Sequence, residues 1–261
     1  MKLGFLTGGT AEDVRFARQN GFDCVELALF GDTPLFQDHQ AFKSALKDEG
    51  ITLAAVSLFG RNHQDPDETL RQANAVLWER AADLAVELGT DVFVAGAGRI
   101  PTLPDESQWD EVAERLRPRI AAVQRRGLRF AFYNCNWENV IDRPAAWACV
   151  LPKLPGTGIK FDPSHPVYDQ RDWLAELLEA GPKLVHLHAK DVLRVGGILI
   201  SDPNPGLGQI DWGAFFGILY HVAYDGAVCI EPHSARYTGK DRHRFLALSG
   251  RYLRQFLLPG A

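Results

Sequence analysis

The sequence predicts an α/β fold, a single (β/α)8 TIM barrel that covers residues 1–261 as one domain. Eight short apolar runs alternate with helical patterns along the whole chain, and no linker or shift in composition divides them. An open doubly wound sheet would carry a G-x-G-x-x-G loop after its first strand. The only candidate, TGGTAED at residues 7–13, does not fit that motif, so the barrel is the better interpretation.

The predicted strands are short runs rich in β-branched and aromatic residues, bounded by glycine, proline or polar residues. The eight runs are residues 3–7, 24–29, 51–59, 92–96, 128–134, 157–162, 183–188 and 227–231.

The clearest predicted helix follows the third strand. Asp65 is the expected N-cap, Pro66 the first helical residue, and Glu68 completes a capping box. Gly89 is expected to end this helix, and Pro118 should kink or break a later one. The other helical patterns cover residues 11–21, 40–50, 109–127, 144–151, 171–181, 212–222 and 242–258.

Composition excludes several classes of protein. The net charge is −5, from 33 acidic and 28 basic residues, so no electrostatic footprint for nucleic acid is present. No apolar run reaches the roughly 18 residues of a membrane span, and the N-terminus lacks the features of a signal peptide. The four cysteines show no C-x-x-C spacing, which suits a reducing compartment. We therefore expect a cytoplasmic protein.

Three neighbouring predicted strands end in residues that bind metal ions. Active sites of these barrels lie at the carboxyl ends of the strands, where the sixth run gives Asp162, the seventh His188 and the eighth Glu231. Side chains alternate along a strand, so all three can face the barrel interior. Two carboxylates and an imidazole suit one divalent ion, such as Mn²⁺, Co²⁺, Mg²⁺, Fe²⁺ or Zn²⁺.

Each of these residues also has a simpler explanation. Asp162 before Pro163 is compatible with turn chemistry alone, and a histidine at a strand end is commonly a hydrogen-bonded structural residue. Their coincidence on three consecutive strand ends favours a site. His186 lies one pleat deeper than His188 and is interpreted as a supporting residue.

Four motifs in order resemble the xylose-isomerase-like barrel superfamily, which includes ketose 3-epimerases and inosose dehydratases. The resemblance spans about the last half of the chain and is specific for the superfamily, not for a substrate. The motifs are DPSH at 162–165, HLHAKD at 186–191 with Arg194 after it, PGLGQIDW at 205–212 and IEPH at 230–233.

The resemblance implies roles for individual residues. Sugar epimerases of this group hold their metal with Glu, Asp, His and Glu from strands five to eight, and Asp162, His188 and Glu231 match the last three. Glu231 is then the catalytic base, and His165 and Arg194 contact the substrate. The first ligand position is a departure, because Tyr133 stands where those enzymes have glutamate.

The predicted function is a metal-dependent sugar or polyol isomerase or epimerase. It removes a proton next to a carbonyl and forms an enediolate, with His165 or Tyr133 moving the second proton. Glu26, at the second strand, is a further candidate for substrate binding. Because a tyrosine is a weak base, Tyr133 predicts poor ketose 3-epimerisation and favours dehydration or isomerisation.

Two other classes remain open. One is an endonuclease IV-like nuclease, which would need further histidines on strands three and four; those runs contain none, although His63 follows nearby. The other is a non-catalytic sugar-binding barrel, which would use Arg194 and Trp137 without a metal. The expected partner is a small sugar or polyol, and a homo-oligomer is possible.

Overall fold

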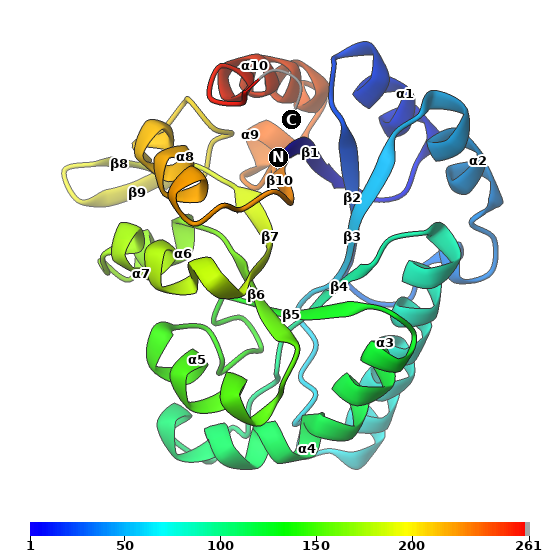
Figure 1. Cartoon of the computed structure of the whole chain (residues 1–261), viewed down its shortest axis with the longest axis vertical. Coiled ribbons are helices and arrows are strands. Elements are labelled where there is room, and N and C mark those ends of the chain that lie inside the picture. Colours follow the sequence, from blue (N-terminus) through cyan, green and yellow to red (C-terminus); the bar gives the residue numbers. More distant parts are fainter. Residues whose placement is uncertain (259–261) are drawn as a thin grey trace.

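The strands form a closed barrel. In this computed structural model, which describes residues 1–258, every neighbouring pair of barrel strands is parallel and the order is β1-β2-β3-β4-β5-β6-β7-β10 (Figure 1). The predicted fold class is confirmed. The strands are β1 Lys2–Thr7, β2 Cys24–Leu29, β3 Thr52–Leu58, β4 Val92–Ala95, β5 Arg129–Tyr133, β6 Thr157–Phe161, β7 Leu184–Ala189 and β10 Ala227–Ile230.

Helices follow the strands and form an outer ring around them (Figure 1). Three 3₁₀ turns, at Pro34–Phe36, Leu151–Lys153 and Gly181–Lys183, complete the connections. The helices are α1 Ala11–Gln19, α2 Gln40–Glu49, α3 Glu68–Leu88, α4 Asp105–Arg125, α5 Pro144–Val150, α6 Ser164–Tyr168, α7 Trp173–Ala180, α8 Trp212–His221, α9 Ala235–Thr238 and α10 Arg242–Arg254.

Helix α3 begins two residues later than the capping pattern predicted. Asp67, not Asp65, is the N-cap, and its Oδ1 accepts hydrogen bonds from the backbone N–H groups of Thr69 (2.7 Å) and Leu70 (3.3 Å). Asp65 instead accepts a bond from the N–H of Asp67 in the preceding turn, so it shapes the entry to the helix. Gly89 ends the helix as predicted, in the left-handed conformation at φ 83°.

Pro118 does not break helix α4, which runs continuously from Asp105 to Arg125. The proline lies on the exposed side of the helix, whereas Leu116 and Ile120 beside it are buried. Packing of that buried face outweighs the hydrogen bond that Pro118 cannot donate, which is why the expected break is absent.

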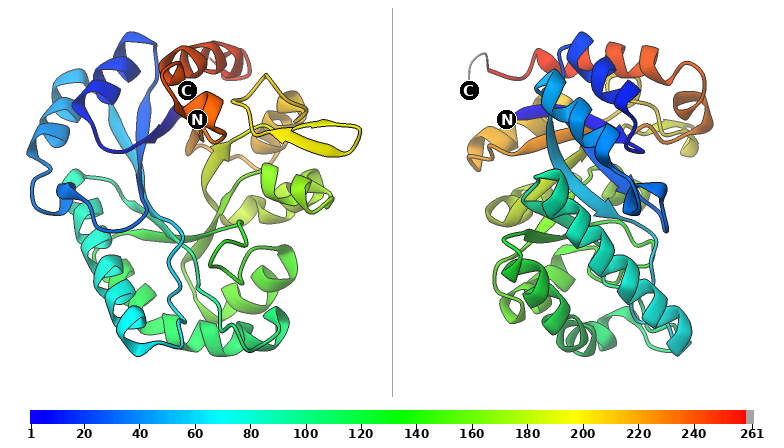
Figure 2. Two further views of the ribbon diagram at one scale, coloured as in Figure 1. Left: turned by 180° about the vertical axis from the view of Figure 1, so that it is seen from behind. Right: turned by 90° about the vertical axis from the view of Figure 1, so that its right-hand side faces the viewer.

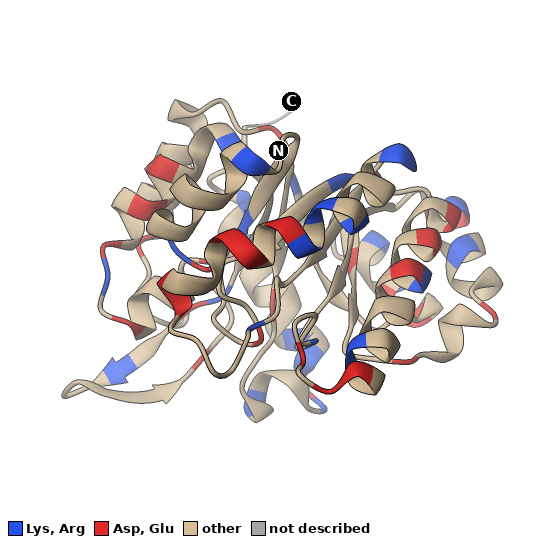
Figure 3. Ribbon diagram, turned by 90° about the horizontal axis from the view of Figure 1, so that it is seen from below, with Lys and Arg blue, Asp and Glu red and all other residues tan. Residues whose placement is uncertain are grey.

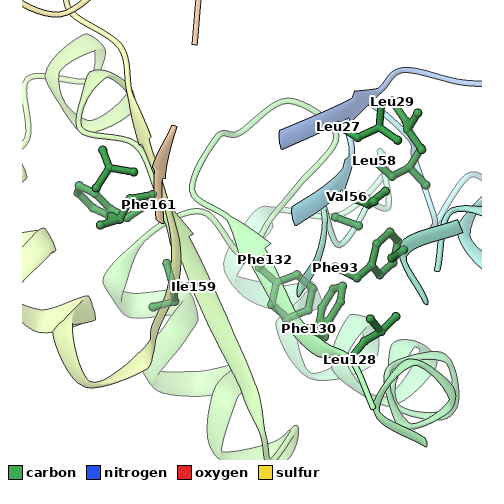
Figure 4. Packing of buried hydrophobic residues seen from close by; sticks show 14 of the residues in the cluster. Leu27, Leu29, Val56, Leu58, Phe93, Leu128, Phe130, Phe132, Ile159 and Phe161 are labelled. Atoms are coloured by element: carbon green, nitrogen blue, oxygen red, sulfur yellow. The ribbon is translucent and has the colours of Figure 1, made fainter. Parts of the chain in front are cut away.

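Two hydrophobic layers hold the barrel. The outer layer lies between strands and helices, and Figure 4 shows part of it: Phe93 of β4 and Phe130 of β5 lie near Val56 and Leu58 of β3, while Phe161 of β6 lies apart from them. The inner layer includes several small side chains, among them Cys24, Ala55, Ala131 and Cys229. Small inner residues leave the carboxyl end of the barrel free for polar side chains.

The connection between β7 and α8 contains an unpredicted β-hairpin. Strands β8 (Leu193–Val195) and β9 (Ile198–Ser201) pair in antiparallel fashion around Gly196 and Gly197, both at positive φ. The hairpin extends outward from the barrel (Figure 2, left, yellow). After the hairpin, residues 202–211 lead to α8 without forming a helix or strand.

Asp191 holds the segment after the hairpin against the barrel. Its buried carboxylate accepts hydrogen bonds at 2.9–3.1 Å from four backbone N–H groups and one side chain. The donors are the N–H groups of Val192, Gly206, Gly208 and Ile210 and the indole of Trp212. This single side chain therefore fixes the fold of the whole turn.

Within residues 1–258, no helix combines the length and apolar character needed to cross a membrane. Acidic and basic side chains alternate over the helices that face the viewer in Figure 3, so neither sign of charge dominates that view.

Glu176 should make the fold less stable as the pH rises. Burial in helix α7 raises the pKa of this carboxyl to about 7, although Arg171 lies 3.2 Å away. The folded state therefore keeps a proton that the unfolded chain loses above its ordinary pKa. Relative to Glu176→Gln, the free energy of unfolding of the wild type should fall by about 2 kcal/mol between pH 4.5 and 8. Urea unfolding of both proteins across this range checks it, and a pH-independent difference would contradict it.

Candidate active site

A cavity of about 720 Å³ opens at the carboxyl ends of the barrel strands. Its wall includes three residues that the sequence predicted for the site, namely Tyr133, His165 and Glu231. Aromatic side chains and two lysines complete much of it. Among the other lining residues are Phe30, Phe59, Trp137, Lys160, Lys190, His233 and Arg242.

The three predicted metal ligands converge. One ligand atom from each of Asp162, His188 and Glu231 lies within 4.8 Å of the others. Asp162 is fully buried: its Oδ1 accepts the N–H of Ser164 at 2.9 Å, and its Oδ2 lies 3.2 Å from the ammonium of Lys190. The expected turn contact therefore exists through Oδ1, while Oδ2 faces a cationic side chain.

Glu26 forms a hydrogen bond with the imidazole ring of His188. The Nε2 atom of His188 lies 2.9 Å from Oε2 of Glu26, and its Nδ1 lies 3.0 Å from Oε2 of Glu231. Glu26 also contacts His186 Nε2 at 2.6 Å and accepts a bond from Ser57 Oγ at 2.6 Å. A carboxylate that binds one ring nitrogen orients the ring, and here it turns Nδ1 toward Glu231.

Glu26 therefore lies in a different place from the one that we expected. Its side chain is fully buried below the site and does not line the cavity, so a contact with substrate does not fit its position. Although burial raises its pKa, the charges of His186 and His188 outweigh this effect and hold the pKa well below the usual range. Burial lowers the pKa of His188, but Glu26 outweighs it and raises the pKa overall.

Lys190 is a central residue that the sequence analysis missed. Its Nζ lies 3.2 Å from Oδ2 of Asp162 and 3.2 Å from Oε2 of Glu231, and the side chain is buried. The two carboxylates outweigh burial and raise its pKa well above the usual range. The signal was present in the sequence, because Lys190 follows His188 by two residues and so shares its face.

The charge of Lys190 also acts on its partners. Burial raises the pKa of Glu231, but Lys190 and the hydrogen bond from His188 outweigh it and hold that pKa well below the usual range. Burial and the positive charge of Lys190 lower the pKa of His165 to about 3. At neutral pH the site thus contains an ionised Glu231, a protonated Lys190 and a neutral His165.

Tyr133 lines the cavity, but its hydroxyl is engaged. The phenol donates a hydrogen bond of 2.8 Å to the backbone carbonyl of Trp137, and burial raises its pKa far above the usual value. The proton is therefore held firmly on the phenol oxygen and directed toward the Trp137 segment. This geometry suits a positioning role better than the proton transfer that we expected.

The two expected substrate-binding side chains differ in position. His165 lines the cavity, with Nε2 3.5 Å from Oδ2 of Asp162. Arg194 lies on β8 and donates to the carbonyls of Tyr168 (3.2 Å) and Gly197 (3.3 Å), and it is not part of the cavity wall. The hairpin directs Arg194 away from the wall, so a substrate contact requires its side chain to turn.

Comparisons with known proteins agree with this architecture. The sequence profile of the xylose isomerase-like TIM barrel matches residues 14–254. A ketose 3-epimerase of Arthrobacter globiformis is 28% identical over 256 residues, which cover 91% of this chain and 84% of that protein. This relative is an epimerase, the class of enzyme that the motifs predicted.

Solved structures show the same fold. D-psicose 3-epimerase of Clostridium cellulolyticum H10, determined with D-tagatose, has a TM-score of 0.80 and 18% identity, and the match covers 98% of this chain and 99% of that one. A probable 3-DHS dehydratase of Bacillus anthracis has a TM-score of 0.78 and 15% identity over 97% of this chain and 99% of that one. At these identities the likeness establishes the barrel alone.

Proposed function

Because the chain belongs to the xylose isomerase-like TIM barrel family, we propose that it is a metal-dependent sugar or polyol isomerase or epimerase. The observation that carries this proposal is the convergence of Asp162, His188 and Glu231 at the edge of one cavity. The ketose 3-epimerase relative supports the choice of substrate class.

The residues present fit a divalent cation. Asp162 and Glu231 each offer a carboxylate oxygen that lies 3.2 Å from the ammonium of Lys190, so both oxygens already face a cation, as buried carboxylates require. His188 offers Nδ1, since Glu26 holds its Nε2, and Glu231 offers a carboxylate oxygen. Two oxygens and one nitrogen suit a first-row transition metal, with positions left for substrate.

The reaction begins with proton removal from a carbon next to a carbonyl. A bound divalent cation supplies Lewis-acid polarisation of that carbonyl. Glu231 is ionised, lies on the cavity wall and accepts the proton. The ammonium of Lys190 and the neutral imidazole of His165 both line the cavity and donate hydrogen bonds to substrate oxygens, which stabilises the enediolate.

Dehydration is the second candidate, and one observation favours it. No carboxylate occupies the position of Tyr133, whose hydroxyl is bound to the Trp137 carbonyl, so the opposite face of the enediolate lacks an obvious second base. A dehydratase uses the same first step and then expels a β-hydroxyl, which needs an acid on oxygen instead. The protonated Lys190 can supply that proton.

A product panel separates the two reactions. The purified protein is stripped of metal, reloaded with Mn²⁺, Co²⁺, Mg²⁺ or Zn²⁺, and assayed by NMR against ketoses and inososes. Metal-dependent formation of an epimer or isomer supports the leading proposal, and an unsaturated product supports dehydration. If the protein retains tightly bound sugar but converts none of the panel with any metal, it is a binding barrel. Cleavage of DNA at abasic sites would favour the nuclease class.

Tyr133→Phe should separate a catalytic from a positioning role. The Tyr133 hydroxyl donates a hydrogen bond to the Trp137 carbonyl. We therefore expect kcat to fall by less than about tenfold and the free energy of unfolding to fall by about 1 kcal/mol. Steady-state kinetics and urea unfolding measure both quantities. A hundredfold loss of kcat with unchanged stability would instead assign Tyr133 to proton transfer.

A further inference from the structure

Lys160 is a buried cation at the active site for which the reaction proposed above has no use. It lies on β6, two residues before Asp162, so both side chains point to the barrel interior. Its side chain is only 2% exposed and lines the cavity. In the part of the chain that the structure describes, Lys160 forms no ion pair, and its ammonium lies 5.8 Å from the centroid of the Phe59 ring.

The other carboxylates of the site are already engaged. Glu26 is shared by His186 and His188. Asp162 and Glu231 both pair with Lys190. Lys160 therefore contributes a positive charge that no neighbouring carboxylate neutralises directly.

Binding of a divalent cation increases this excess of positive charge. The cation would use Asp162 and Glu231, which are also the two partners of Lys190. Lys190 then shares its two carboxylate partners with the cation, and Lys160 has no such partner. A buried charge without a partner is destabilising, so the loaded site favours a negatively charged ligand.

We propose that the substrate is an anionic keto sugar or keto polyol whose carboxylate or phosphate contacts Lys160 and Lys190. This inference rests on the proposed function and specifies its substrate class. Both lysines are two residues from a metal ligand along their strands, so the negative group lies close to the reacting carbons. A carboxylate on the carbon skeleton fits that place better than a phosphate at the far end of a sugar.

The test compares ligands that differ in one group. D-Fructose, 2-keto-D-gluconate (the same skeleton with a carboxylate at carbon 1) and D-fructose 6-phosphate are titrated into the Mn²⁺-loaded protein by calorimetry. We expect one of the two anions to bind about ten- to a hundredfold more tightly than fructose, since a hydrogen bond between charged groups contributes this much. The anion that gains affinity identifies the source of the charge.

Three variants assign that preference to Lys160. Lys160→Met removes the charge at similar length and should abolish the preference for the anion. Lys160→Arg keeps the charge and should retain part of it. Lys183→Met, at an exposed position before β7, is the matched control and should bind like the wild type. Circular dichroism and thermal unfolding verify that each variant is folded.

The outcomes distinguish this inference from the proposed function. If fructose binds as tightly as both anions and is converted, the function stands and the inference is wrong. If an anion binds through Lys160 but no ligand of the panel is converted, the inference stands and the proposed function is wrong. An anion preference that persists in the Lys160→Met variant would also overturn the inference.

Discussion

Replacement of Glu231 by glutamine is expected to lower kcat at least about a thousandfold, because general-base catalysis contributes roughly 10²–10⁴. Glutamine has nearly the same shape but cannot accept the substrate proton. The loss should appear in kcat more than in KM, since the amide oxygen still reaches Lys190 and the substrate. Steady-state kinetics of the metal-saturated protein measures both values.

Two controls accompany this variant. Glu12→Gln alters an exposed carboxylate in the first turn of α1 and should retain wild-type kinetics. Elemental analysis of Glu231→Gln shows how much metal Asp162 and His188 retain, so a loss of metal can be separated from a loss of the base. Turnover within a factor of about three of the wild type would exclude Glu231 as the base.

Removal of the Asp191 carboxylate is expected to have the largest effect on stability. Asp191→Ala leaves five donors without their acceptor, and each buried unpaired donor costs about 1–3 kcal/mol before the turn relaxes. We expect a net loss of about 3–5 kcal/mol in the free energy of unfolding, measured by urea denaturation.

Asp211→Ala is the matched control for this loss. Asp211 is also an aspartate of the same connection, but it caps helix α8 through one hydrogen bond to the N–H of Ala214 at 2.9 Å. Its removal should cost about 1 kcal/mol. Equal losses in the two variants would show that the Asp191 network does not stabilise the turn beyond an ordinary helix cap.

The barrel could be predicted because its strands are covered on both sides. Parallel strands under helices are almost continuously apolar, and helical patterns separate them at regular intervals. The hairpin β8–β9 was missed although Gly196-Gly197 between two β-rich runs is a known hairpin signal. The helix start at Asp67 was missed because Asp65 offers the same chemistry two residues earlier.

The metal ligands could be predicted from strand alternation, but their supporting contacts could not. Asp162, His188 and Glu231 follow from the rule that successive side chains face opposite sides. Glu26 reaches His188 across the barrel interior, from a strand that is not adjacent to β7, and only the closed barrel brings them together. The position of Arg194 depends on the hairpin. Because the hairpin was not predicted, the position of Arg194 was predicted wrongly as well.

The central claim is that Glu231 removes a proton from the carbon next to a carbonyl. It is tested most directly by incubating the metal-loaded protein with its best keto substrate in heavy water, followed by NMR and mass spectrometry. We expect one deuterium from solvent in an epimer or isomer, at the carbon that receives the proton, and no incorporation with Glu231→Gln. An epimer or isomer that forms without any solvent deuterium would indicate hydrogen transfer between carbons and would contradict the account.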